Sequence, residues 1–341
     1  MRHGPQLSKP TARPGPAATS SEVGTGHAPA HHGELLQGVF ADEDGRPRRA
    51  LVTLPQPELR SRAIFHPSHH HWGVVGTPEL EKVRRAAARA LREFGARPAA
   101  AKGGWIEITS DVPRGIGMGS STADVTAAIR AVADYHGVAL SVEQVARLAV
   151  SAECASDSVM IDGRVVLFAH RDGVVLESLG DQLPPMTVVG CDTDPSGTGV
   201  DTLALRPAEY DQRELTTLEA LRVALRHAVA TGDVALLAEV STESARLNQR
   251  FLAKPVLEPL LELGDGCGAL GIQVAHSGTV AGLIFDPRLP DTENKVATAR
   301  AGLADLGLPE TTVIRVPSQT APVGGEHTAE SALPRVEVIA G

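Results

Sequence analysis

The sequence predicts an α+β fold built in two halves, and three observations lead to this prediction. The chain has 341 residues, which is long for one domain and suits two. In each half, strand patterns and helical patterns follow one another in a way that favours a sheet with helices on one face. A proline-rich break at Leu183-Pro-Pro185 separates the two patterns. We therefore expect domains over residues 26–185 and 186–318.

The first half is expected to open with a strand over 33–40, a turn over 42–45 and a strand over 49–54. The capping box Ser141-Val-Glu-Gln144 marks the start of a helix, and Arg171-Asp-Gly173 is typical of a hairpin turn. The other expected elements are a short extended piece at 64–65, a helix over 78–94 closed by Gly95, a strand over 104–109, a helix over 120–136, a helix from 141 to 153, and hairpin strands over 164–169 and 174–179.

The second half is expected to alternate strands with helices after the break. Its expected strands cover 186–191, 271–274, 281–285 and 312–316, and its expected helices cover 214–231, 234–251, 255–263 and 293–306. Residues 1–25 are rich in Pro, Gly, Ser and Thr without periodicity, so we expect a disordered leader there. Residues 319–341 are similar and predict a flexible tail.

Composition excludes several classes of partner. The net charge of −9 argues against a polyanion such as nucleic acid held by bulk charge. The three cysteines (Cys154, Cys191, Cys267) are far apart, which excludes a disulfide framework and a thiolate zinc site and fits a reducing, cytoplasmic location. No apolar run approaches the length of a membrane span, and the N-terminus has no secretory signal pattern.

The segment from Asp111 to Asp124, Asp-Val-Pro-Arg-Gly-Ile-Gly-Met-Gly-Ser-Ser-Thr-Ala-Asp, carries the most information about function. Three alternate glycines let backbone N–H groups turn toward an anion, and the helix that follows adds unpaired donors and the positive end of its dipole. Hydroxyl groups at the junction are suited to a phosphate-bound metal ion. The segment therefore predicts a cradle for a nucleotide triphosphate.

Two other glycine-rich motifs do not fit this segment. A P-loop ends in Gly-Lys-Ser/Thr, and none of the five lysines of this chain follows a glycine. In the dinucleotide fingerprint, the third glycine would fall on Ser120 and the later acidic residue on Asp134, inside a helical pattern. A tight strand-to-helix turn without a ligand is the remaining alternative.

The pattern Pro-x-Gly-x-Gly-x-Gly-Ser-Ser-x-Ala at 113–123 resembles the phosphate-binding motif of the GHMP kinases, a superfamily that includes galactokinase, homoserine kinase, mevalonate kinase and phosphomevalonate kinase. Residues 28–38 (Ala-Pro-Ala-His-His-Gly-Glu-Leu-Leu-Gln-Gly) resemble its N-terminal motif, and residues 275–282 (Ala-His-Ser-Gly-Thr-Val-Ala-Gly) resemble its C-terminal glycine-rich motif. The resemblance covers about 27–318. Within the superfamily, the motifs look most like those of the L-threonine kinases of the cobalamin and propanediol pathways.

The resemblance implies a two-lobed fold, with an N-terminal half like ribosomal protein S5, a ferredoxin-like C-terminal half and the active site between them. It implies ATP and Mg²⁺, with the metal held by Ser121 and by a glutamate for which Glu153 is our candidate. Asp157 is the candidate for the catalytic base or hydroxyl-orienting group. A solvated helix end remains the alternative for Glu153, and an Asx turn or N-cap remains the alternative for Asp157. The predicted ATP-binding residues are Pro113, Gly115, Gly117, Met118, Gly119, Ser120, Ser121 and Thr122.

The acceptor alcohol is expected to contact the N-terminal and C-terminal motifs. The candidates are Glu34, Gln37, Asp124, His276, Ser277, Gly278 and Thr279. Asp124 is also explained as a partner of the helix dipole, and the third motif as a plain strand-to-strand turn. His31 and His32 stand where the threonine kinases have Ser-Cys. A metal site built from His27, His31, His32 and Glu34 is disfavoured, because alternate residues of a strand point to opposite faces. His69-His-His71 reads as a solvated loop.

These residues predict an ATP-dependent kinase of a small hydroxy amino acid, with L-threonine as the leading acceptor and a homodimer as one possible assembly. A kinase of another hydroxylated amino acid or amino alcohol stays open. So does a protein of this fold that binds nucleotide or metabolite as a sensor without transferring phosphate.

Overall fold

The computed structural model describes residues 22–94, 101–161, 163–194, 197, 208–251 and 253–317. The expected tail and most of the expected leader lie outside these ranges, as does Gly95. The first strand already begins at Gly24, two residues before the expected start of the first domain. The boundary expected at 183–185 falls between two strands and stays a prediction.

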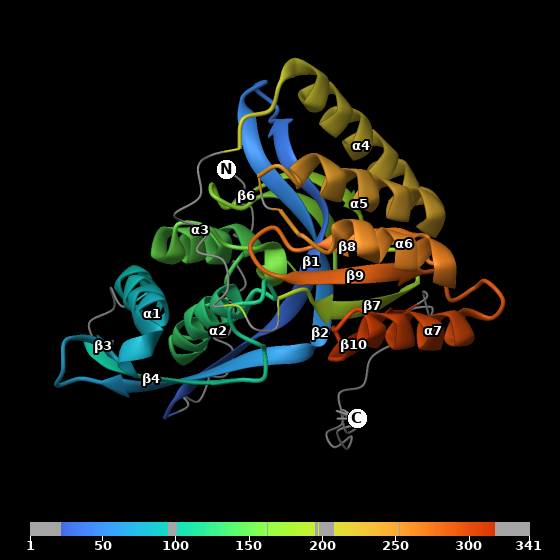
Figure 1. Cartoon of the computed structure of the whole chain (residues 1–341). Coiled ribbons are helices and arrows are strands. Elements are labelled where there is room, and N and C mark those ends of the chain that lie inside the picture. Colours follow the sequence, from blue (N-terminus) through green and yellow to red (C-terminus); the bar gives the residue numbers. More distant parts are fainter. Residues whose placement is uncertain are drawn as a thin grey trace, which may run out of the picture.

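The strands of the described chain form one sheet, which joins both halves. Strand β1 (Gly24–Ala41) and strand β2 (Pro47–Ser68) are the longest and pair antiparallel across the centre of the molecule (Figure 1). The strand order is β10-β7-β9-β8-β1-β2-β4-β3, with β5 attached to β2 and β6 attached to β5. Glu34 of β1 pairs with Val274 of β8, so the N-terminal motif meets the C-terminal half directly. The predicted α+β class is confirmed.

Strand β2 corrects the prediction of two separate pieces at 49–54 and 64–65. The continuous strand contains Pro55 and Pro57, and each proline removes a ladder hydrogen bond. The pairing accommodates them through an irregularity, because the partner of Pro29 is Arg60 while the partner of Ala30 is Gln56. Residues 57–59 therefore bulge out of the ladder, and the strand continues on both sides.

In the first half, three helices pack on one face of the sheet. They are α1 (Glu81–Phe94), preceded by a 3₁₀ turn at Pro78–Leu80, α2 (Ser120–Tyr135) and α3 (Val142–Glu153). The short strand β3 (Gly73–Val75), which the sequence did not predict, lies parallel to β4 (Gly103–Ser110) at the edge. The expected capping box at Ser141 is confirmed by reciprocal bonds with Gln144. Alanine-rich helix faces and Phe65, Ile106 and Ile129 form the core between these layers.

The second half packs its helices against the remaining strands, and Figure 1 shows them grouped on the side of the molecule opposite α1 and α2. Strands β5 (Val165–Ala169) and β6 (Val174–Gly180) end the first half. The strands of the second half are β7 (Met186–Asp192), β8 (Gly271–Val274), β9 (Val280–Phe285) and β10 (Thr311–Val316). The helices are α4 (Gln212–Thr231), α5 (Val234–Asn248), α6 (Leu257–Cys267) and α7 (Thr292–Asp305). Helix α6 extends four residues beyond the expected end, and Gly268 terminates it in a left-handed conformation.

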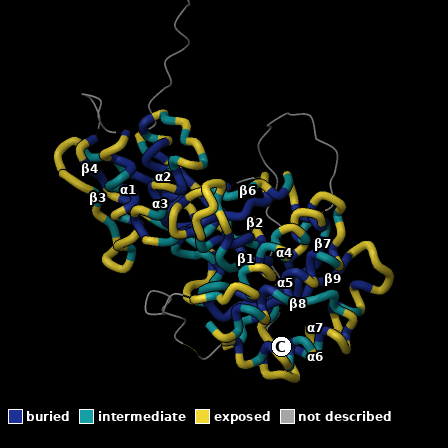
Figure 2. Tube along the Cα trace, turned by 90° about the horizontal axis from the view of Figure 1, so that it is seen from above, coloured by how far each residue is buried: buried dark blue, intermediate teal, exposed yellow. Residues whose placement is uncertain are grey.

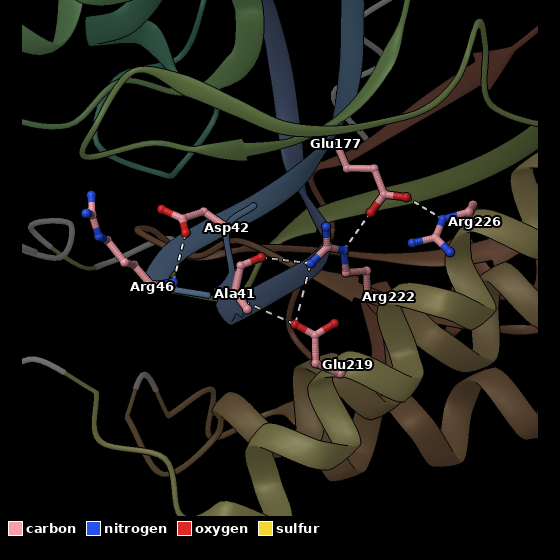
Figure 3. A network of polar contacts seen from close by, with 7 residues as sticks. All are labelled: Ala41, Asp42, Arg46, Glu177, Glu219, Arg222 and Arg226. Carbon is pink, nitrogen blue, oxygen red and sulfur yellow. Dashed lines mark hydrogen bonds and ion pairs between the residues drawn. The ribbon is translucent and has the colours of Figure 1, made fainter. Parts of the chain in front are cut away.

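A polar network ties α4 to the central strands (Figure 3). Arg222 of α4 donates to Glu177 of β6 at 2.5 Å and to the carbonyl oxygen of Ala41 at 3.1 Å. Arg226 also contacts Glu177, whose side chain is 16% exposed. Because two arginines share one largely buried carboxylate, this network fixes α4 over the end of β1.

Figure 2 shows buried segments running through the centre of both halves, while the outer turns are exposed. Among the described residues, no helix combines the length and the apolar character that spanning a membrane requires.

Candidate active site

A cavity of about 260 Å³ opens where the glycine loop meets the turns after α3, β5 and β8. Ten of the predicted site residues line it. They are Gly115, Gly117, Gly119, Ser120, Ser121, Thr122, Glu153, Asp157, His276 and Ser277. Four residues that the sequence did not single out complete the lining: Lys82, Ala155, His170 and Arg171. The glycine loop and the third motif thus share one cavity, as expected.

The glycine loop has the backbone that its sequence demands. Gly115, Gly117 and Gly119 have φ values of 83°, 90° and 70°, a region that residues with a Cβ rarely adopt. Gly119 is the N-cap of α2 and supplies no side-chain cap, so the first N–H groups of the helix stay available to a ligand. Such a helix start, facing a cavity, suits a phosphate group.

The third motif packs directly on this loop. The N–H groups of Thr279 and Val280 donate to the carbonyl oxygen of Ile116 at 2.9 and 3.0 Å. A Cβ on Gly278 would lie 2.3 Å from the Cα of Gly117, closer than any real contact. The glycine is therefore required by the close approach of the two loops, which a plain strand-to-strand turn would not need.

Ser121 and Glu153 form an oxygen pair at the edge of the cavity. The Ser121 hydroxyl donates to Glu153 at 2.8 Å, and the Thr122 hydroxyl donates to its other oxygen at 3.0 Å. Glu153 is only 5% exposed, so it is not a solvated helix end. Burial, aided by the charge of Asp157, raises the pKa of Glu153 to about 7. A buried carboxylate and a hydroxyl are hard oxygen donors, so this pair fits Mg²⁺.

Asp157 faces the imidazole of His31. Its Oδ2 lies 3.0 Å from Nε2 of His31, and the aspartate side chain is 20% exposed while the histidine is almost fully buried. Burial opposes both charges, yet the mutual attraction outweighs it: the pKa of His31 rises to about 9 and that of Asp157 falls to about 2. Asp157 begins a 3₁₀ turn but makes no capping bond, so the capping explanation is not supported.

A bulge brings Glu34 to the same side of β1 as His31. In a regular strand these residues would face opposite sides, and that expectation is wrong here. Gly33 has a φ of 64° and the pairing register shifts between His31 and Glu34, which places Nδ1 of His31 3.9 Å from Oε1 of Glu34. His31, Glu34 and Asp157 offer ligand atoms within 4.8 Å of one another. Because the two carboxyl groups face different ring nitrogens, the arrangement fits a charge pair better than one shared metal ion.

Glu34 and Gln37 contact His276 of the third motif on the side away from the cavity. Glu34 accepts a hydrogen bond from the N–H of His276, and Gln37 Oε1 lies 2.8 Å from Nδ1 of the same residue. Burial raises the pKa of Glu34 to about 8. Both side chains are about 3% exposed and neither lines the cavity, so their contact with an acceptor stays a prediction.

Asp124 does not line the cavity either. It accepts from the Ser61 hydroxyl at 2.6 Å and pairs with Arg114 at 3.1 Å, so it ties the glycine loop to β2. Its suggested contact with a substrate amine remains a prediction without support from this geometry. Pro113, Met118, Gly278 and Thr279 also lie outside the lining; Met118 is buried, and its carbonyl oxygen accepts from the N–H of His31 at 3.2 Å.

Comparison with known families agrees with this geometry. Residues 81–163 match the family model "GHMP kinases N terminal domain", and residues 222–305 match "GHMP kinases C terminal". The chain belongs to the GHMP kinases. The homoserine kinase of Cytophaga hutchinsonii superposes on 89% of the chain and 96% of its own length, with a TM-score of 0.63 at 16% identity. The mevalonate kinase of Staphylococcus aureus covers 86% of the chain and 99% of its own, with a TM-score of 0.58 at 16% identity.

Among characterised relatives, this GHMP kinase is 31% identical to the L-threonine kinase of Citrobacter freundii over 206 residues, which is 55% of the chain and 64% of the relative. The L-threonine kinase of Salmonella typhimurium is 30% identical over 60% of the chain and 65% of its own length. The chain thus spans just under two thirds of these relatives. A homoserine kinase of Limosilactobacillus fermentum is 27% identical over 63% of the chain and 74% of its own length.

Sequence reasoning missed four side chains of this GHMP kinase's cavity and its wall. Lys82 in the first turn of α1 lies 3.3 Å from the Ser121 hydroxyl. The chain has only five lysines, and the place of Lys82 near the start of an expected helix was a weak sign of a functional role. His170 and Arg171 belong to the hairpin turn that the sequence predicted without giving it a function. The pairing of His31 with Asp157 was not predicted, because the two residues are 126 positions apart in the chain.

Proposed function

We propose that this protein is an ATP- and Mg²⁺-dependent kinase that phosphorylates the hydroxyl group of a small hydroxy amino acid, with L-threonine as the acceptor. The observation that carries the proposal is the shared cavity, which joins a phosphate-type loop, the oxygen pair of Ser121 and Glu153, and an ionised Asp157. Similarity to two L-threonine kinases favours threonine over other acceptors.

The loop and the start of α2 bind the phosphate groups of ATP through backbone N–H donors. Ser121 and Glu153 hold Mg²⁺, which supplies charge neutralisation to the transferred phosphoryl group when it is bound. Lys82, beside Ser121, adds a positive charge at the same end of the cavity. These groups position the donor and stabilise developing charge.

Asp157 accepts a hydrogen bond from the acceptor hydroxyl and directs its oxygen at the phosphoryl group. A carboxylate with a pKa near 2 is a weak base, so it takes the proton late, as the new P–O bond forms. His31 holds this carboxylate in place and keeps it ionised. We therefore assign Asp157 an orienting role first and a proton-accepting role second.

The test is substrate-dependent ADP release. Purified protein with Mg·ATP is offered L-threonine, L-serine, L-homoserine and the aminopropanol formed by decarboxylation of L-threonine. We expect release with L-threonine to exceed that with the other three, and mass spectrometry to detect O-phospho-L-threonine. Turnover with another acceptor but not with L-threonine would keep the kinase and reject threonine. Absence of turnover with every acceptor would favour the non-catalytic sensor.

A further inference from the structure

One end of the cavity carries a cation whose role the proposed reaction does not explain. Arg171 lies in the turn between β5 and β6 and lines the cavity beside His170 and His276. Its guanidinium makes no ion pair or hydrogen bond with any residue in the described ranges. His170 is 4% exposed and its Nδ1 also lacks a partner there. Arg171 is exposed, so its guanidinium is reachable from the cavity, whereas the Nδ1 of His170 is closed off from solvent.

The two histidines at this end of the cavity carry no charge near pH 7. Burial lowers the pKa of His170 to about 3 and that of His276 to about 4, and Arg171 and Arg49 add repulsion against protonation of both rings. Both histidines are therefore neutral near pH 7, and their rings stack edge to face with centroids 5.0 Å apart. Arg49 already donates to the carbonyl oxygen of Ala208 at 3.1 Å. Arg171 remains as a cation that is free to bind an anion.

A series of contacts links the polar and charged residues that line the cavity. Lys82 touches Ser121, which touches Glu153, and the Thr122 hydroxyl lies within 3.4 Å of both Glu153 and Asp157. Asp157 in turn interacts electrostatically with His170 and His276, beside Arg171. Arg171 thus lies beside the two histidines that interact with Asp157, while Lys82 is linked to Asp157 through Ser121, Glu153 and Thr122. An acceptor whose hydroxyl contacts Asp157 can therefore present its other end to Arg171.

We propose that Arg171 binds the α-carboxylate of the acceptor and thereby selects amino acids over amino alcohols. This inference rests on the proposed function, because it assumes that the hydroxyl lies at Asp157. A guanidinium matches a carboxylate with two parallel hydrogen bonds, which orients the acceptor as well as attracting it.

The test compares Arg171→Gln with the unaltered protein on two acceptors. L-threonine and its decarboxylated aminopropanol share the amine and the hydroxyl and differ in the carboxylate. We expect kcat/KM for L-threonine to fall about 10- to 100-fold, through KM more than kcat, and kcat/KM for the aminopropanol to change less than about twofold. Arg171→Lys should recover part of the loss. Arg46→Gln, an exposed arginine of another hairpin turn, is the matched control and should change neither value.

Two results would overturn the inference. An equal loss on both acceptors would make Arg171 a structural residue, and a rise in KM for ATP with acceptor constants unchanged would make it a phosphate ligand. If the unaltered protein turns over no acceptor, the proposed function fails by itself. Calorimetric measurement of L-threonine binding then tests the carboxylate assignment. The unaltered protein must bind L-threonine, and Arg171→Gln must bind it about 10-fold more weakly. Undetectable or equal binding would reject it.

Discussion

The two acidic residues of the cavity have pKa values displaced in opposite directions. Burial and the charge of Asp157 raise the pKa of Glu153 to about 7, so a bound cation would stabilise its ionised form. Asp157 is ionised at any pH above about 2, since His31 outweighs the cost of its burial. Under the proposed function, these different pKa values suit Glu153 to a metal ion and Asp157 to a hydroxyl group.

Replacing Ser121 with alanine tests the metal assignment at this scale. The substitution removes one oxygen donor of the Ser121–Glu153 pair, so we expect the apparent affinity for Mg²⁺ in the ATPase or kinase assay to fall about 10- to 100-fold. Titration of Mg²⁺ at fixed ATP measures this. Ser151→Ala is the control, because that hydroxyl bonds only to the carbonyl oxygen of Leu148. An unchanged Mg²⁺ dependence in Ser121→Ala would reject the assignment.

At the scale of elements, the site depends on contact between the glycine loop and the β8–β9 turn. Gly278→Ala should destabilise the protein by about 1–3 kcal/mol and lower kcat/KM, because the new Cβ would displace the loop at Gly117. Urea unfolding and steady-state kinetics measure the two effects. Gly266→Ala in α6 is the matched control, since a Cβ there meets nothing within 4 Å and alanine favours the helix. A stable, fully active Gly278→Ala would show that the close approach is not needed.

Elements with strong local signals were predictable from the sequence. The capping box at Ser141 and the positive-φ glycines of the loop depend on neighbouring residues alone, so their patterns predict their structure. The pairing of His31 with Glu34 was not predictable, because it depends on a bulge at Gly33 that the partner strand imposes. Arg171 and Lys82 reach the cavity from elements whose packing only the tertiary structure fixes. The glycine loop, the two acidic residues and the third motif were thus visible in the sequence, whereas Lys82, His170 and Arg171 were not.

For the whole molecule, the buried site predicts a maximum of stability near pH 6.5. Three histidines are kept neutral in the fold, with pKa values lowered to about 4, 3 and 4: His32, His170 and His276. Below pH 6.5 these three histidines bind protons in the unfolded chain but not in the folded chain. The free energy of unfolding therefore falls as the pH falls. Between about pH 4.5 and 6.5, these three outnumber the two carboxyl groups whose pKa values rise above that range, Glu34 and Glu153; the smaller rise at Asp124 acts in the same direction as theirs.

Above pH 6.5 the direction reverses. The folded chain keeps the proton of His31 up to about pH 9, that of Glu34 up to about pH 8 and that of Glu153 up to about pH 7, so stability is lost as the pH rises. We expect a slope on the order of 1 kcal/mol per pH unit below pH 6.5 and a steeper one above it. Urea unfolding near pH 5, 6.5 and 8.5 measures them. A free energy of unfolding that still increases from about pH 6.5 to 8.5 would contradict these pKa assignments.

The proposed phosphoryl transfer depends most on Asp157, which receives the hydrogen bond and then the proton of the acceptor hydroxyl. The most direct measurement is the rate of phosphoryl transfer from ATP to L-threonine in Asp157→Asn, together with ATP binding by the same variant. The amide keeps the shape of the carboxylate but cannot accept a proton. We predict a kcat lowered by about 10²- to 10⁴-fold while the dissociation constant for Mg·ATP stays within about twofold. An Asp157→Asn variant that transfers phosphate at the rate of the unaltered protein would contradict it.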